Sequence, residues 1–177
     1  MELKEAVSLV ASLMELSCCT APKSLGQNFV RTKVLAGEDL KVLAEEMIKY
    51  GKEKGDPNFD RDAEGVRRSE ALLLVSIDNP TPLGLNCGAC GCERCADLNS
   101  VEGPEFKGPL CSWRYIDLGI ALGSAVKTAS LHNVDNRIMY RAGVVARRMG
   151  LIDGELAVGV PLSATGKNIF FDRPAKK

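Results

Sequence analysis

The stretch Ala71-Leu-Leu-Leu-Val-Ser-Ile77 decides the fold, because it is apolar at every position except Ser76. Its length suits a β-strand, and apolar side chains at odd and even positions alike predict a strand that is buried on both faces. The following Asn79-Pro80-Thr81-Pro82 ends the strand, since proline has no N–H for a ladder. A strand of this kind needs helices on both sides, so the segments around it must supply them.

The segments on either side of this strand carry the periodic patterns of helices and further strands. Apolar residues at helical spacing predict helices over 3–16, from about 40 to 51, and from about 115 to 131. Asp135 is a candidate N-cap for another helix that ends at Gly150. We expect strands at 30–35 and 156–160 and a fourth strand at 168–172, a surface connection at 52–63, and a short helical segment at 64–70.

The helix predicted at 115–131 is rich in small residues. Gly119, Ala121, Gly123 and Ala125 leave little side-chain volume on it, so we expect another element to pack very close. Helices alternate with few strands along the chain, which limits the class to α+β or α/β.

Composition limits the kind of protein further. The chain has 177 residues, which fits one domain over 1–177, and 45% are apolar and 26% charged. Lys plus Arg and Asp plus Glu each number 23, so no net field attracts nucleic acid or a membrane surface. The first apolar stretch carries Glu2, Lys4 and Glu5, which is unlike a secretory signal, and no uncharged run has the length of a membrane span. We therefore expect a cytoplasmic protein.

Cysteine is the residue type that points to chemistry. Of the seven cysteines, five lie in a segment at about 83–112 that interrupts the apolar pattern. Seven is odd, so complete internal disulfide pairing is excluded, and clustered cysteines in a reducing compartment indicate metal binding or redox chemistry. The segment reads Cys87-Gly-Ala-Cys90-Gly-Cys92-Glu-Arg-Cys95, with Cys111 further on. This pattern predicts an iron–sulfur cluster, and Gly88 and Gly91 allow the tight loop that it needs.

Three alternatives remain open on spacing alone. A structural zinc ion usually takes two C-x₂-C pairs separated by a long spacer, whereas Cys87/Cys90 and Cys92/Cys95 are nearly contiguous. Disulfides or inert thiols are a second alternative. Within the cluster hypothesis, Cys92 could replace Cys95 as the third ligand.

The cysteine pattern resembles the [4Fe–4S] module with the spacing C-x₂-C-x₄-C and a distant fourth cysteine. The resemblance implies Cys87, Cys90, Cys95 and Cys111 as ligands and leaves Cys92 out. The chain as a whole resembles a family of uncharacterised ferredoxin-domain proteins, DUF2148. The matching segments are Ala21-Pro22-Lys23, the cysteine loop, Asp117 to Ala125, Val134-Asp-Asn-Arg137, and Pro161 to Asn168.

The order of elements also resembles that of FMN-dependent nitroreductases. Ala21-Pro22-Lys23, Asp117-Leu118-Gly119 and Gly159-Val160-Pro161 stand where that family has comparable turns. The resemblance implies an α+β sandwich of a small sheet with flanking helices, in which the cysteine-rich segment is an insertion. It also implies an intertwined homodimer with FMN at the interface.

The family's N-terminal arginines are missing from residues 1–16, so the flavin phosphate needs other partners. Lys23, Arg31 and Lys167 are candidates by charge alone.

Together these resemblances predict a redox protein that moves electrons through a [4Fe–4S] cluster, with FMN as a second cofactor and an electron-donor protein as a partner. Its activity would be that of an oxidoreductase of unidentified substrate. The alternative is a non-enzymatic binding or sensor protein, in which the cluster or a zinc ion is structural.

Overall fold

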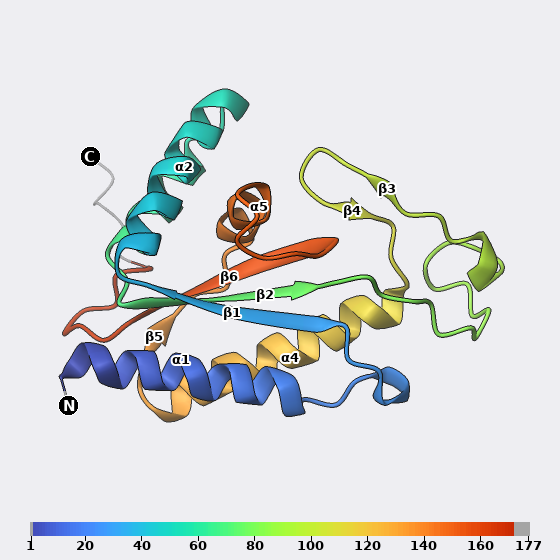
Figure 1. Ribbon diagram of the computed structural model, residues 1–177, viewed down its shortest axis with the longest axis horizontal. Helices are drawn as coiled ribbons and strands as arrows, with labels where there is room; N and C mark the ends of the chain where they lie inside the picture. The colour runs from blue at the N-terminus through green and yellow to red at the C-terminus, as the bar shows by residue number, and fades with distance from the viewer. Residues whose placement is uncertain (1, 172–177) are drawn as a thin grey trace.

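The sheet has the strand predicted from 71–77 at its centre. The computed structural model describes residues 2–171, and in it four antiparallel strands lie in the order β1-β2-β6-β5 (Figure 1). β2 is buried at all its positions. The bounds are β1 Val30–Ala36, β2 Ala71–Ile77, β5 Asp135–Asn136 and β6 Leu156–Ser163.

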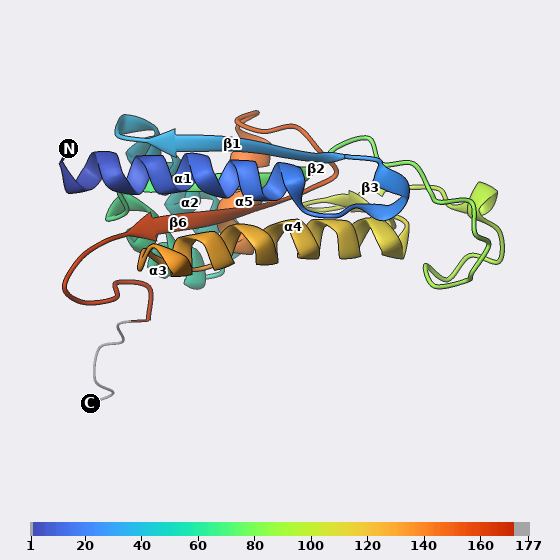
Figure 2. The same cartoon turned by 90° about the horizontal axis from the view of Figure 1, so that it is seen from below.

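Helices cover both faces of this sheet (Figures 1 and 2). On one face lie α1 (Leu3–Thr20) and α4 (Ser112–Leu131), and their core includes Leu73 and Val75 of β2. The neighbouring β2 residues Leu72 and Leu74 pack with the helices of the other face. Those helices are α2 (Glu38–Lys54), α3 (Asn58–Arg67) and α5 (Tyr140–Arg148). The α+β sandwich is thus confirmed, and its two cores follow from the alternation of side chains along β2.

α1 and α4 lie side by side and run in opposite directions (Figure 2). The small residues of α4 divide between two faces. Ala121 and Ala125 are buried in the core that α4 shares with α1, which is the close packing expected. Gly119 and Gly123 lie on the outer face, where an added Cβ would meet nothing within 4 Å. The expectation of a close neighbour therefore holds for the alanines, while the two glycines face open space.

The predicted connection at 52–63 is wrong. α2 continues to Lys54, α3 begins at Asn58, and α3 also covers most of the short helical segment expected at 64–70. Burial explains the difference, because Phe59 and Val66 of α3 are fully buried against the α2–α5 side of the sheet. The apolar positions are few, and charged residues between them hide the helical period.

The predicted role of Asp135 is also wrong. Asp135 pairs with Ser163 in β5, at the edge of the sheet, and α5 begins only at Tyr140. The fourth strand is therefore β5, while 168–171 form no strand and Asp172 lies outside the described residues. α5 lies very close to β6, because a Cβ on Gly143 would stand 2.0 Å from the Ala157 carbonyl oxygen.

The insertion runs from the end of β2 to the start of α4 and projects beyond the sheet (Figure 1). It contains a short 3₁₀ turn at Cys95–Asp97 and the hairpin β3 (Val101–Glu102) and β4 (Lys107–Gly108). A second 3₁₀ turn, Ser24–Gly26, follows α1 and lies beside α4. Over residues 2–171, no helix has the length and apolar character to cross a bilayer.

Candidate metal centre

The insertion has two parts, which we call the cysteine loop (83–100) and the hairpin arm (101–110). Every residue of the cysteine loop is at least partly exposed to solvent. Four of the five clustered cysteines lie in this loop, and the fifth, Cys111, lies just after the hairpin arm. The sulfur-bearing residues therefore come from a projecting loop and from the beginning of α4.

Cys111 is held in a defined place. It is the N-cap residue of α4 and is 6% exposed. The residues just before it are fixed by two hydrogen bonds: the Ser100 hydroxyl donates to the Pro109 carbonyl at 2.6 Å, and the Leu110 N–H donates to the Tyr115 hydroxyl at 3.2 Å. Cys111 is therefore held at the N-terminal end of α4 by the chain on both sides of it.

The cysteine loop contacts the first turn of α4 through Ser112. The Ser112 hydroxyl donates to the Ala89 carbonyl at 2.8 Å. The Ala89 backbone N–H and, after it, the Trp113 indole lower the pKa of the Cys87 thiol below its usual value. Hydrogen bonds to the charged form have this effect, so Cys87 is predisposed to be a thiolate.

The remaining loop cysteines lie close to one another. Cys95 and Asn86 are doubly joined: the Asn86 N–H donates to the Cys95 sulfur at 3.3 Å, and the Cys95 N–H donates to the Asn86 side-chain oxygen at 2.8 Å. The thiol of Cys92 is within hydrogen-bonding reach of Cys90, and loss of water contact, followed by the charge of Cys90, raises the pKa of Cys92. Cys92 therefore lies close to Cys90, although the resemblance left Cys92 out of the ligand set.

Within residues 2–171, no three Cys, His, Asp or Glu side chains stand close enough together to hold a metal ion. The chemistry of the donor set nevertheless suits an iron–sulfur cluster, since four thiols come from one loop and one helix cap. Gly88 and Gly91 have φ angles of 71° and 87°, which bend the loop back on itself. The loop would have to draw its sulfur atoms inward around a cluster, and its exposure leaves it free to do so.

A buried arginine anchors the root of the cysteine loop. Arg114 is fully buried, donates from Nε to the Thr81 carbonyl at 2.8 Å, and pairs with Asp117 at 3.1 Å. Asp117 in turn accepts hydrogen bonds from the N–H and the hydroxyl of Ser24 at 2.8 and 2.9 Å. The same guanidinium also bonds the Ser24 carbonyl and the Gln27 side chain and lies 4.6 Å from the Phe29 ring centroid. This network joins the base of the loop to α4 and to the turn after α1.

The hairpin arm is attached to the opposite helix layer. Arg147 of α5 binds both carboxylate oxygens of Glu102, at 2.7 and 3.0 Å, and the Glu105 carbonyl at 3.2 Å. The Lys107 N–H donates to the Glu155 carbonyl at 2.9 Å, and the Glu155 carboxylate accepts from the Asn79 N–H at 2.8 Å. Both ends of the insertion are therefore tied to the start of β6.

The three candidate phosphate residues do not come together within one chain. The Lys23 ammonium bonds the carbonyls of Cys18 and Cys19 at the end of α1, and Arg31 pairs with Asp78 at 3.3 Å. Lys23 and Arg31 lie near the insertion, since Arg31 is opposite Ser76 near the end of β2. Lys167 follows the far end of β6, and a strand of that length separates its ends by roughly 20 Å.

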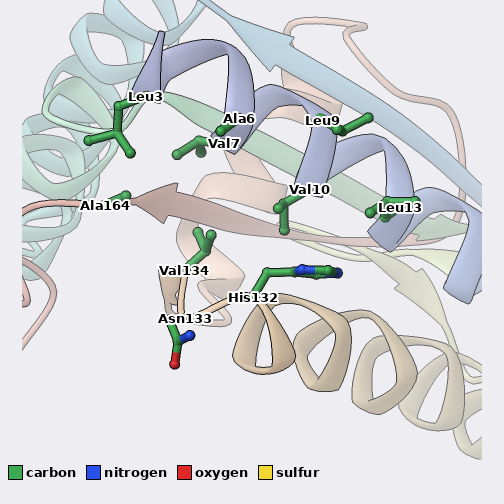
Figure 3. A pocket seen from close by; sticks show the side chains of 10 residues that line it. All are labelled: Leu3, Ala6, Val7, Leu9, Val10, Leu13, His132, Asn133, Val134 and Ala164. Atoms are coloured by element: carbon green, nitrogen blue, oxygen red, sulfur yellow. The ribbon is translucent and has the colours of Figure 1, made fainter. Parts of the chain in front are cut away.

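An apolar groove lies at the other end of α4, where α1 passes over the turn that follows α4 (Figure 3). It has a volume of about 350 Å³. Leu3, Leu9 and Leu13 of α1 line one side, and His132 and Val134 line the other. The single histidine therefore lies far along α4 from the cysteines and takes no part in their site.

Solved structures define the class of fold. The FMN-dependent nitroreductase NfnB from Mycobacterium smegmatis, in complex with NADPH, matches with a TM-score of 0.61 and 10% identity over 90% of this chain and 78% of that protein. An NADPH:FMN oxidoreductase from Vibrio harveyi matches with a TM-score of 0.57 and 13% identity over 90% and 60%. A BluB-like flavoprotein from Clostridium difficile gives 0.56 and 15% over 96% and 84%. The chain has the nitroreductase fold, as its turn sequences predicted.

Sequence relatives define the family. An uncharacterized protein from Archaeoglobus fulgidus is 45% identical over 98% of this chain and 95% of its own length. The profile of the uncharacterized proteins containing a ferredoxin domain, DUF2148, matches residues 107–173. The chain belongs to this family. The matched range includes Cys111 and the whole of α4.

Proposed function

We propose that this protein is a redox protein that binds a [4Fe–4S] cluster through Cys87, Cys90, Cys95 and Cys111. One observation carries the proposal: the cysteine loop contacts the first turn of α4, whose N-cap is Cys111, through the hydrogen bond of the Ser112 hydroxyl to the Ala89 carbonyl at 2.8 Å. Three ligands from one loop and a fourth from a fixed helix end is an arrangement that suits a cubane cluster.

When bound, the cluster supplies one-electron transfer. The residues of this chain hold it and set its surroundings. The helix cap fixes the position of Cys111, the Asn86 N–H donates to the Cys95 sulfur, and Arg114 fixes the root of the loop. An electron-donor protein would meet the exposed cysteine loop, which is the part of the site that solvent reaches.

FMN is the second cofactor in this proposal, and its binding needs two copies of the chain. Lys23 and Arg31 lie at the insertion end of the sheet, and Lys167 lies at the other end. A phosphate that uses all three would take Lys23 and Arg31 from one copy and Lys167 from the other. Two structural neighbours support this proposal, since one is an FMN-dependent nitroreductase and the other an NADPH:FMN oxidoreductase.

The outer face of α4 is the proposed contact with the second copy. Gly119 and Gly123 leave open space along it, and Ile116 and Ile120 beside them are 47% and 41% exposed. Apolar side chains that flank two glycines one turn apart allow a second helix to approach closely. We therefore propose a homodimer in which this face is covered.

Anaerobic purification with iron, sulfide and flavin assays tests the proposal directly. We expect iron and sulfide in a ratio near one and a brown protein whose visible absorption bleaches on reduction. The variant Cys95→Ala should lose the cluster, while the matched variant Cys92→Ala should keep it. The reverse result would show that Cys92 is the ligand, and iron without sulfide, or zinc alone, would contradict the cluster.

The flavin is tested by heat denaturation, which should release a yellow chromophore with the absorption of FMN. Lys167→Ala should weaken FMN binding at least tenfold, and Lys41→Ala, at an exposed lysine of α2, should leave it unchanged. A colourless supernatant after reconstitution with excess FMN would remove the flavin from the proposal.

The dimer is tested by sedimentation. Ile120→Glu should shift the protein to a monomer, while Val42→Glu, an exposed position on α2, should not. A wild-type monomer at high concentration would rule out the two-copy phosphate site. A cluster that no donor reduces would favour the alternative function, a structural cross-link or a sensor in a binding protein.

A further inference from the structure

The turn Ser24–Gly26 holds an apolar side chain in solvent. Leu25 has a φ angle of 57° and is 70% exposed. Bulky residues seldom adopt this left-handed conformation, and here no burial of the side chain offsets its cost. The turn is nevertheless fixed, because Asp117 accepts from the N–H and the hydroxyl of Ser24, and Arg114 donates to the Ser24 carbonyl at 3.1 Å. The chain thus presents one leucine as a rigid apolar projection.

The apolar groove is the complementary feature. Side chains of α1 lie along one side of it and those of the turn after α4 along the other (Figure 3). Leu3 and Leu9, which line it, are exposed to solvent, so nothing among residues 2–171 fills the groove. Its lining is apolar except for His132 and Asn133, so an apolar side chain suits it.

The projection and the groove lie at opposite ends of one pair of helices, α1 and α4 (Figure 2). The turn that carries Leu25 follows α1 and bonds to the beginning of α4, whereas the groove lies between the first part of α1 and the turn after α4. α1 has 18 residues and extends for about 27 Å, so Leu25 does not reach the groove of its own chain. Between the two ends, Leu16, Ile116 and Ile120 are exposed apolar residues of the two helices.

A twofold axis across the middle of this helix pair would exchange its ends. In a contact of this symmetry both copies use the same surface, so a projection at one end meets a groove at the other and the contact forms twice. The proposed approach of two α4 helices at Gly119 and Gly123 places such an axis there, since both glycines lie near the middle of α4. Burial of two leucine side chains would then favour association.

We infer that Leu25 of each copy inserts into the apolar groove of a second copy of this chain. The inference rests on the proposed homodimer and adds to it the residue and the groove that set its register. The exposed leucine and the open groove are then two halves of one contact. The rigid turn limits the conformational entropy that association costs.

The test is a double-mutant cycle on the dimer dissociation constant, measured by sedimentation of the full chain. Leu25→Asn removes the apolar side chain and keeps a residue that tolerates a positive φ, and Leu9→Asn changes the groove. Each variant should raise the dissociation constant at least about tenfold, and the double variant should raise it by less than the product of the two. Val42→Asn, at an exposed position on α2, should leave it unchanged.

A photoreactive side chain locates the contact. With p-benzoylphenylalanine at position 25, irradiation should give a covalent dimer, and mass spectrometry should assign the cross-linked peptides to residues 3–13 or 132–134. The same side chain at position 42 should give no covalent dimer, and Ile120→Glu should abolish the cross-link from position 25.

A wild-type dimer whose dissociation constant is unchanged by Leu25→Asn would overturn the inference and leave the proposed homodimer standing. Cross-links from position 25 that reach only other segments of the second copy would do the same. Loss of the cross-link on addition of excess FMN, in a protein that stays dimeric, would show that the flavin and not Leu25 occupies the groove. A wild-type monomer would overturn the proposed homodimer, and this inference would fall with it.

Discussion

The two parts of the insertion are held to the protein in different ways. The hairpin arm is clamped onto α5 and β6 by Arg147 and Glu155, and most of its residues are half-buried or buried. The cysteine loop has no buried residue and is bonded chiefly at its edges, to α4 and at its root by Arg114. The difference teaches that the arm belongs to the fold and sets the place of Cys111, whereas the loop adds no buried side chain to it.

The largest effect should come from the anchor of the loop root. Arg114→Met removes a fully buried cation and leaves Asp117 without its charge partner, so we expect a loss of about 3–5 kcal/mol in the free energy of unfolding. Urea denaturation measures it. Arg31→Met is the control, because Arg31 pairs with Asp78 at an exposed site and should cost no more than about 1 kcal/mol. Equal losses in the two variants would contradict the anchoring role.

The next effect contrasts a thiol of the core with a thiol of the loop. Burial raises the pKa of Cys18 to about 11, from a usual value of 9.0, while hydrogen bonds lower that of Cys87. Below pH 9 Cys18 is neutral whether the chain is folded or unfolded. From pH 9 to 11 it ionises only when unfolded, so stability should fall by up to about 2–3 kcal/mol over that range.

The stability difference between wild type and Cys18→Ala at several pH values isolates this term. The wild type should lose stability relative to Cys18→Ala as the pH rises from 9 to 11. A constant difference would show that burial does not raise the pKa of the Cys18 thiol. In the metal-free protein at pH 7, iodoacetamide should modify Cys87 much faster than Cys18.

A smaller effect should come from the clamp on the hairpin arm. Arg147→Met removes the bonds to Glu102 and to the carbonyls of Glu105 and Gly154, so we expect a loss of about 1–2 kcal/mol. Limited proteolysis should then cut within 101–108 as readily as within the cysteine loop. Arg148→Met, next in sequence but exposed, should leave the arm resistant to proteolysis.

The smallest effect on the fold should come from the cysteine loop itself. Replacing residues 85–98 by a Gly/Ser segment of equal length should lower the stability of the metal-free protein by no more than about 1 kcal/mol, because no buried side chain is lost. Thermal denaturation checks it. A loss above about 3 kcal/mol would show that the cysteine loop is part of the folded core, as the hairpin arm is.

Local patterns were enough to predict the elements that bury apolar faces. β1, β2, β6 and most of α1, α2 and α4 lie where their spacing placed them. α3 was missed because its buried face includes a charged residue, Asp62, which is 3% exposed. Asp62 is tolerated there since its neighbour Arg61 pairs with it at 2.7 Å and Arg141, from a helix far along the chain, pairs with it at 3.1 Å. The adjacent Arg61–Asp62 pair is common on solvated segments, and no local pattern contains Arg141, so the segment resembled a solvated connection.

The residues of the candidate site also divide into those that a local sequence pattern predicts and those that depend on contacts made in the fold. The cysteines of the loop were visible as a motif because their spacing is local, Cys111 followed as the last of the clustered cysteines, and the resemblance decided for Cys95 over Cys92. Ser112, Trp113 and the full burial of Arg114 were not visible, since each depends on which loop the first turn of α4 meets. The Arg114–Asp117 spacing of one helical turn was the only local signal of that network, and it is common on solvated helices as well.

The length of α4 would limit electron flow in the proposed redox protein. Its twenty residues extend for about 30 Å between Cys111 and the apolar groove at His132. An electron cannot tunnel across such a span in one step at a useful rate, so within one polypeptide the two ends of the helix are insulated from each other. Two copies joined about a twofold axis with their α4 helices antiparallel would place the beginning of one beside the end of the other. A path for electron transfer from the proposed cluster to the groove would then cross from one subunit to the other.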